Sequence, residues 1–185
     1  MKNPFTLLLM GLFGGCASIP DGLQAVGGFE PERYLGTWYE IARLDHFFER
    51  GLDGVSAEYS ANPDGSIRVV NRGYDPVRTK WKEAVGRAVF RGPRDEARLK
   101  VTFFWPFSGA YNVLELDRDS YSYAIVCGPN RSYFWILART PTLPPALKDR
   151  LVAIAAAWGF DTPSLIFPKP VEPPAAPGAG RPTAP

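Results

Sequence analysis

The sequence predicts an all-β domain: an eight-stranded antiparallel up-and-down β-barrel with one C-terminal helix packed against its outside. Three observations support this prediction. Short alternating runs of apolar and polar residues recur about every ten positions, separated by turn-forming residues. One later stretch has helical periodicity. Hydrophobic residues make up 45% of the 185 residues, which is enough for one core.

Eight alternating segments are expected to form the strands of the barrel. Turn signals bound them at residues 62–65, 75–76, 92–93 and 128–130, where Pro, Gly, Asn and Asp cluster. The longer connection at residues 45–54 is expected to cover the open end of the barrel. The expected strands are residues 37–44, 55–59, 66–74, 83–91, 98–104, 110–116, 122–127 and 133–139.

The fourth expected strand, residues 83–91, has small side chains on one face. Ala84, Gly86 and Ala88 alternate with larger residues, and Phe90 continues the same face. A barrel of about eight strands is just wide enough to hold one small ligand, so small inward side chains favour a cavity. The alternative interpretation is that these small residues lie beneath the packed helix.

A helix is expected after the prolines at residues 144–145, and Gly159 is expected to end it. The short apolar run at residues 165–167 can then pair with the first strand. Residues 168–185 are so rich in Pro, Ala and Gly that we expect a disordered tail. The apolar stripe that should pack on the barrel consists of Leu147, Leu151, Ile154, Ala155 and Trp158.

Gly36 and Trp38 at the start of the first strand predict the closed end of the barrel. In small barrels a Trp from this strand often fills the floor, and an Arg guanidinium can lie across its indole in a cation–π contact of roughly 0.5–2 kcal/mol. Arg139, at the end of the last expected strand, is the candidate cation. Gly36 lets the chain turn sharply into the strand.

The N-terminus has the features of an export signal that ends at a cysteine. The apolar run at residues 5–13 is too short to span a bilayer, for which about 20 residues are needed. Small residues before Cys16 resemble the bacterial lipobox, in which the cysteine is acylated and becomes the new N-terminus. Phe13 departs from the Leu usual at its position, and Ala17, in place of a retention Asp, implies transfer to the outer membrane. The expected organisation is a lipoprotein signal peptide at residues 1–15, a lipidated N-terminus and spacer at 16–30, the barrel with its helix at 31–167 and the tail at 168–185.

The chain contains only two cysteines, Cys16 and Cys127. Acylation of Cys16 would leave Cys127 without an intramolecular partner, so no disulfide framework is expected. The alternative is a plain secretory peptide followed by a Cys16–Cys127 bridge. Because Cys127 lies in an apolar alternating run, we interpret it as a small buried hydrophobic residue.

Charge and residue usage argue against several functions. The formal net charge is only +2, with basic residues spread among acidic ones, so no nucleic-acid partner is expected. His46 is the only histidine, no Gly-x-Ser-x-Gly motif occurs, and the cysteines lack ligand spacing, so we expect no catalytic residue, metal or cofactor. His46, beside Phe47 and Phe48, is interpreted as a loop residue that caps the cavity.

Four stretches of the chain match motifs of one protein family: residues 34–43, 46–51, 111–117 and 126–141. On these motifs the chain resembles the bacterial outer-membrane lipocalins, in the branch that includes apolipoprotein D. The family's first and third signature segments map onto Gly36, Trp38 and Arg139. The middle segment, Thr-Asp-Tyr in many members, is not present in that form, and Tyr111-Asn112-Val113 with Asp117 resembles the divergent bacterial version.

The resemblance implies that the barrel binds an amphiphile, a fatty acid or a lysophospholipid, for lipid storage or transport in envelope maintenance. It also implies a lipid anchor in the outer membrane, with the barrel facing the periplasm. An aromatic lumen can bury an acyl chain while the polar head stays at the rim. The candidate wall residues, which could instead pack against the outer helix, are Phe90, Phe103, Tyr111, Tyr133 and Trp135.

Two other functions stay open at this point. One is an anchored partner-binding module whose cavity is incidental, and the other is a lipid-modifying enzyme. The sequence also leaves open whether the protein is a monomer or a homodimer.

Overall fold

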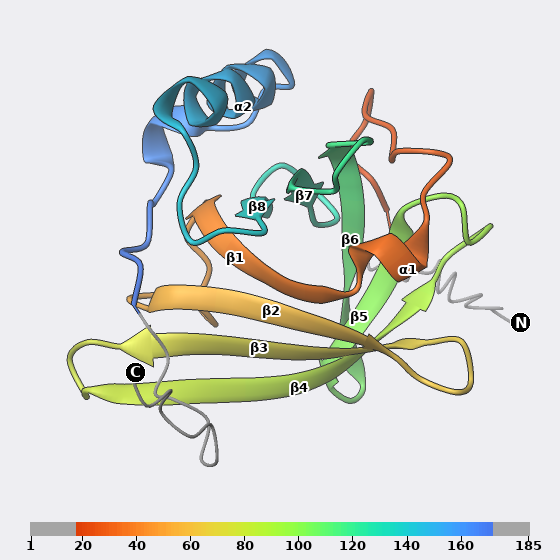
Figure 1. Ribbon diagram of the computed structural model, residues 1–185, viewed down its shortest axis with the longest axis horizontal. Helices are drawn as coiled ribbons and strands as arrows, with labels where there is room; N and C mark the ends of the chain where they lie inside the picture. Colours follow the sequence, from red (N-terminus) through yellow and green to blue (C-terminus); the bar gives the residue numbers. More distant parts are fainter. Residues whose placement is uncertain (1–17, 172–185) are drawn as a thin grey trace, which may run out of the picture.

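The computed structural model describes residues 18–171, and eight antiparallel strands in it close into a barrel (Figure 1). The strands are β1 (Gly36–Arg43), β2 (Asp53–Ala61), β3 (Ile67–Asp75), β4 (Lys80–Phe90), β5 (Arg98–Phe104), β6 (Phe107–Leu116), β7 (Tyr123–Cys127) and β8 (Phe134–Ala138). Each strand pairs with the next along the chain, and β1 also pairs with β8. The predicted up-and-down barrel is therefore confirmed.

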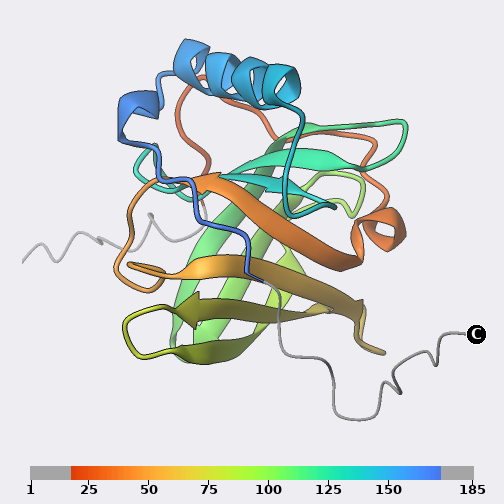
Figure 2. The ribbon, with the colours of Figure 1, turned by 60° about the vertical axis from the view of Figure 1, so that its left-hand side comes forward.

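One helix, α2 (Pro145–Ala157), lies across the outside of the barrel, as predicted (Figures 1 and 2). It buries Leu151 and Ala155 of the expected stripe, and Gly159 follows it with a φ of 78°. After a 3₁₀ turn, η1 (Thr162–Ser164), Ile166 exchanges backbone hydrogen bonds of 2.8 and 3.0 Å with Arg43 of β1. The prediction that residues 165–167 pair with the first strand is confirmed.

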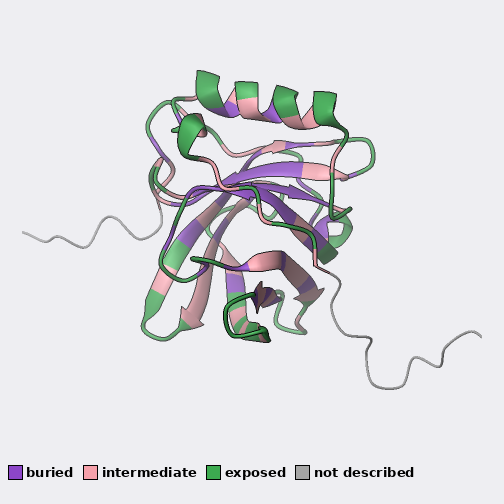
Figure 3. Ribbon diagram, turned by 90° about the vertical axis from the view of Figure 1, so that its left-hand side faces the viewer, coloured by how far each residue is buried: buried purple, intermediate pink, exposed green. Residues whose placement is uncertain are grey.

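The core has two layers because side chains alternate between the two faces of each strand. Along β6, Val113 points into the barrel and Leu114 points to the layer between the barrel and α2. Figure 3 shows the buried residues along the strands and on the side of α2 that faces them. The fully buried Val126 and Ile125 of β7 divide between the layers in the same way.

Four strands extend further toward the open end than the sequence predicts. The hairpin of β3 and β4 continues its pairing to Asp75 and Lys80, and β6 begins at Phe107. Apolar alternation alone cannot predict the extension of β4, because Lys80 and Lys82 are exposed polar residues held in place by ladder pairing with β3. β2 likewise begins at Asp53 rather than at Val55.

The chain before β1 closes the other end of the barrel. Val26 donates a backbone hydrogen bond of 2.9 Å to Val113 and accepts one of 3.0 Å from Ala97. Phe29 then points inward with 3% exposure, and the short helix α1 (Pro31–Tyr34) crosses this end. Among residues 18–171 no helix is both long and apolar enough to cross a membrane.

The expected signal peptide, Cys16 and residues 172–185 lie outside the described residues. Four residues of the expected tail, 168–171, are described. The backbone N–H of Lys169 donates to the Asp53 carboxylate at 3.0 Å, and its carbonyl accepts from Gly54 at 2.8 Å. These contacts tie the end of the described chain to the start of β2.

Candidate ligand-binding site

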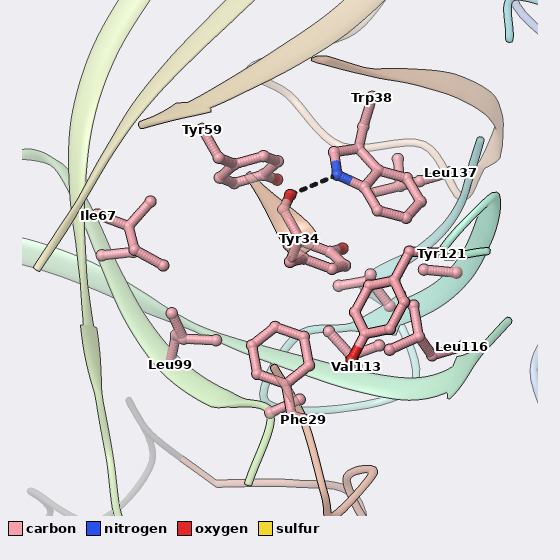
Figure 4. Packing of buried hydrophobic residues seen from close by; sticks show 14 of the residues in the cluster. Phe29, Tyr34, Trp38, Tyr59, Ile67, Leu99, Val113, Leu116, Tyr121 and Leu137 are labelled. Atoms are coloured by element: carbon pink, nitrogen blue, oxygen red, sulfur yellow. Dashed lines mark hydrogen bonds between the residues drawn. The ribbon is translucent and has the colours of Figure 1, made fainter. Parts of the chain in front are cut away.

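Trp38 forms the floor of the barrel interior, which we call the lumen (Figure 4). Its side chain is fully buried, and the indole Nε1 donates to the Tyr34 carbonyl at 2.8 Å. The Arg139 guanidinium carbon lies 4.1 Å from the centre of the indole ring. Arg139 also donates to the carbonyls of Arg33 at 2.7 Å and Thr37 at 2.9 Å. The guanidinium therefore seals the closed end by joining β8 to α1 and β1.

Gly36 allows this close approach. Its φ is +92°, a backbone conformation that favours glycine, and a Cβ at this position would lie 3.4 Å from the Arg139 Nη1. The structure thus brings together Gly36, Trp38 and Arg139, which the sequence analysis singled out.

Three tyrosine hydroxyls meet above the floor. The Tyr111 hydroxyl lies 2.7 Å from that of Tyr34 and 3.0 Å from that of Tyr59. Burial raises the pKa of Tyr59 to about 12 and raises the pKa values of Tyr34 and Tyr111 well above the usual value, so all three stay protonated. These two hydrogen bonds use two of the three hydroxyl protons, which leaves one proton for a further acceptor.

Four of the five predicted wall residues pack against the lumen core: Phe90, Phe103, Tyr111 and Trp135. Each of these side chains is partly buried, and none is fully enclosed by protein. The fifth, Tyr133, lies in the loop between β7 and β8, where its ring stacks on His46 at 5.7 Å. Tyr133 therefore lies at the open end rather than along the wall.

The small residues of β4 face the lumen. Ala88 is 2% exposed and belongs to the lumen core, opposite Ile67 of β3, which rules out a position beneath α2. The space beside Gly86 is already occupied, because a Cβ there would lie 2.7 Å from the Phe103 ring. The expected row of small residues thus accommodates an aromatic wall residue at Gly86 and does not leave empty volume there.

A buried polar cluster borders the open end, which we call the mouth. The Glu49 carboxylate accepts a hydrogen bond from the Trp135 indole at 3.0 Å and lies 3.1 Å from the His46 Nε2. His46 is 4% exposed, and its ring stacks on Phe48 at 4.8 Å. These contacts fix the loop after β1 over one side of the lumen, as expected for a loop that covers the open end.

A buried contact between an arginine and a glutamate lies beneath this loop. The Arg43 guanidinium donates to the Glu40 carboxylate at 2.5 Å and to the carbonyls of Glu49 and Leu52 at 3.0 and 3.3 Å. Both side chains are almost fully buried. Burial, followed by the nearby Glu49 carboxylate, raises the pKa of Glu40 to about 8, although Arg43 opposes this shift. The pair fastens the mouth loop to β1.

The residues with catalytic potential do not form a nucleophilic site. Cys127 is fully buried in the outer layer against α2, and burial raises the pKa of its thiol to about 12. A thiol in this environment is a poor nucleophile. His46 contacts Glu49 and aromatic rings in the mouth cluster. Within residues 18–171, no group of three or more His, Cys, Asp or Glu side chains is arranged to hold a metal ion.

Sequence reasoning missed several residues of this site. A register shift between Glu40 and Ala42 places Arg43 beside Glu40, whereas strict alternation puts these two side chains on opposite faces. The meeting of Tyr34, Tyr59 and Tyr111 depends on strand register and has no local signal. Glu49 lies within the motif at residues 46–51, and its spacing of three from His46 is the local signal for their contact.

Comparisons with known proteins agree with this architecture. Residues 29–170 match a family model described as a lipocalin-like domain. The chain is 48% identical to the outer membrane lipoprotein Blc of Vibrio cholerae, over 90% of this chain and 98% of that protein. It is 51% identical to the protein of the same name from Escherichia coli K12, over 80% and 83%. Mouse apolipoprotein D is 32% identical, over 80% and 78%.

Solved structures with low sequence identity share the fold. Insecticyanin from the tobacco hornworm superimposes with a TM-score of 0.64 at 18% identity, over 84% of this chain and 89% of that one. A cockroach allergen, Per a 4, gives the same TM-score and identity, over 84% and 96%.

Proposed function

Because this chain belongs to the lipocalin family, we propose that it is an outer-membrane lipoprotein that holds one fatty acid or lysophospholipid in its barrel for lipid storage or transport. The observation that carries the proposal is the aromatic lumen above Trp38. Its wall side chains Phe103 and Trp135 are half-buried, so they retain surface that an acyl chain can cover.

The chemistry of the lumen suits an amphiphile that enters with its acyl chain first. Burial of each CH₂ group contributes roughly 0.8 kcal/mol, so a long chain gains useful affinity even after the entropic cost of binding. Polar groups lie at both ends of the lumen. The tyrosine hydroxyls are near the floor, and the His46–Glu49 pair is at the mouth. The polar head of the lipid would stay at the mouth, where water can solvate it.

Membrane attachment would come from acylation of Cys16. The relatives named outer membrane lipoproteins, at 48% and 51% identity, support this part of the proposal. By analogy with bacterial lipoproteins, Cys16 would carry a diacylglycerol thioether and an N-acyl group. These three acyl chains exceed the two membrane-binding signals that stable anchoring needs. The barrel would then face the periplasm.

Binding without catalysis is the expected activity. The buried Cys127 thiol, with its raised pKa, lies in the outer layer, so it does not offer a nucleophile to a lipid in the lumen. Lipid turnover by the purified protein that disappeared in His46→Ala or Cys127→Ala would favour the enzyme instead.

The test is native mass spectrometry of protein purified from its own host's membranes without added lipid, followed by identification of the released small molecule. We expect a stoichiometric adduct with the mass of a fatty acid or lysophospholipid. Protein that is reproducibly bare, and that takes up neither lipid afterwards, would contradict the proposal and favour the partner-binding module.

A further inference from the structure

Exposed apolar side chains gather at the mouth of the barrel. Eight large hydrophobic residues are exposed in the described chain, and six of them lie in or directly beside the three connections at this end. They come from the loop between β1 and β2, the turn between β3 and β4, and the tip of the β5–β6 hairpin. We call this set the mouth patch; its members are Phe47, Phe48, Val77, Phe104, Trp105 and Phe107.

The exposure of the patch is large enough to require an explanation. Trp105 is 89% exposed, Val77 is 89% exposed and Phe47 is 80% exposed. Soluble proteins rarely leave so many large apolar side chains together in water, and such patches mark interaction surfaces. Figure 3 views the molecule from the side of the β1–β2 connection and the β3–β4 turn, and both are coloured largely as exposed.

The start of the described chain, at Ser18, lies near the mouth patch and indicates which surroundings the patch faces. The Ser18 hydroxyl donates to the Pro129 carbonyl at 3.2 Å, and the Asn112 amide donates to the Ser18 carbonyl at 3.2 Å. Pro129 belongs to the β7–β8 loop, which also holds Tyr133 against His46 at the mouth. The described chain therefore begins beside the open end of the barrel.

The segment that would link the lipid anchor at Cys16 to the described chain is short. Only Ala17 separates Cys16 from Ser18, and two residues of chain span at most about 7 Å. An acylated Cys16 would thus hold the side of the barrel near the β7–β8 loop close to the lipid surface. A long linker would allow the barrel many orientations relative to the membrane. This short linker favours the orientation in which the open end of the barrel faces the membrane.

Charges beside the patch suit an anionic lipid surface. The hairpin at residues 75–82 carries Arg78, Lys80 and Lys82 against a single acidic residue, Asp75, which pairs with Arg78 and Lys82 at 2.9 Å each. Basic residues near a membrane are attracted to anionic headgroups, and aromatic side chains partition into the interface.

We propose that the mouth patch inserts into the lipid leaflet that holds the Cys16 anchor, so that the barrel exchanges its ligand directly with this leaflet. The proposal rests on the acylation of Cys16 in the proposed function. Two independent observations carry it: the six exposed apolar residues at one end of the barrel, and the start of the described chain at the same end.

The test uses the full lipidated protein, reconstituted into vesicles of phosphatidylethanolamine and phosphatidylglycerol with brominated acyl chains. The contribution of Trp105 is the difference between the fluorescence of the protein and that of Trp105→Phe. The patch variant is Phe47→Ser/Phe107→Ser. The matched control is Val85→Ser, at a residue of 48% exposure in the middle of β4 and outside the patch.

We expect brominated lipid to quench Trp105 in the wild-type protein and in the control variant. The patch variant should stay on the vesicles through its anchor but lose the quenching. The rate at which it extracts a fluorescent lysophospholipid from the vesicles should fall about tenfold, because each lost Phe removes favourable apolar burial. A protein that takes up no lipid while its Trp105 is quenched would refute the proposed function and support docking.

Three results would overturn the docking proposal. In the first, Trp105 of vesicle-bound protein is as insensitive to bromine as it is in solution. In the second, the protein leaves the vesicles, which would refute the anchor as well. In the third, the wild-type protein sediments as a dimer and the patch variant as a monomer, while the quenching by brominated lipid is the same in both. A second copy of the chain would then be the occupant of the patch.

Discussion

The ring of Phe103 on β5 fills the space that Gly86 leaves on the neighbouring strand β4. A Cβ at residue 86 would lie 2.7 Å from the ring Cδ1 and 3.0 Å from the Thr102 carbonyl oxygen. A Cβ atom at these distances would force the Phe103 ring to move. The position of the ring therefore requires glycine at residue 86. The lumen is shaped by this pair as well as by the size of the barrel.

Gly86→Ala should lower the free energy of unfolding by about 1–3 kcal/mol, because the added methyl group overpacks the site. Chemical denaturation measures the change. In a Phe103→Ala background the same substitution should cost much less, since the clashing ring is gone and the two sites couple directly. An equal cost in both backgrounds would show that the ring is not what excludes a side chain at residue 86.

Trp38→Ala should destabilise the protein by roughly 3–5 kcal/mol, as expected for removal of a large buried aromatic side chain. It also removes the ring beneath Arg139 and the hydrogen bond to the Tyr34 carbonyl. The matched control is Trp105→Ala, at a residue 89% exposed in water, which should change stability by less than about 0.5 kcal/mol. Thermal unfolding of the two variants without vesicles compares them. Similar melting temperatures would mean that Trp38 is not the floor of the core.

The contribution of Glu40 to the free energy of unfolding should fall as the pH rises from 4.5 to about 8. Its pKa is about 8 in the folded protein against an ordinary 4.5, so in this range the folded state binds the proton more tightly than the unfolded state does. Glu40→Gln, which cannot ionise, should remove this part of the slope. Urea unfolding at several pH values measures it, and parallel curves for the two proteins would refute the raised pKa.

Ala57→Trp should block the lumen and weaken lipid binding by at least about tenfold, equivalent to about 1.4 kcal/mol. Ala57 lies on β2 between Trp38 and Asn71 and packs against the lumen core. Val85→Trp adds the same side chain on the outer face of β4, where residue 85 is 48% exposed, and should bind normally. Isothermal titration calorimetry with lysophospholipid compares the affinities of the two variants. Equal affinities would place the ligand outside the barrel.

Cys16→Ser should no longer fractionate with the outer membrane, because the thioether anchor cannot form. Cys127→Ser is the control, since its side chain is buried beneath α2 and has no part in anchoring. Membrane fractionation on a density gradient, with detection of the chain in each fraction, is the measurement. Outer-membrane recovery of Cys16→Ser would show that some other contact holds the protein there.

Local sequence patterns were sufficient for the elements of this fold. Alternation predicted all eight strands to within a few residues, and the stripe through Leu151 and Ala155 predicted the outer helix. The same alternation placed Ala88 of β4 on an inward face, and the structure has it in the lumen core. These patterns succeed because the face on which a side chain lies depends on a period of two or 3.6 residues, which a short segment contains in full.

Only the tertiary structure decided which side chains meet. The bulge after Glu40 turns Arg43 onto the same side, and the register of distant strands brings Tyr59 and Tyr111 together. Which exposed residues share the mouth likewise depended on the direction of each strand around the closed barrel. Register and bulges arise from pairing between segments far apart in the chain, so no local pattern encodes them. The sequence by itself determined the strands and their faces, and barrel closure determined the lumen, the mouth cluster and the apolar rim.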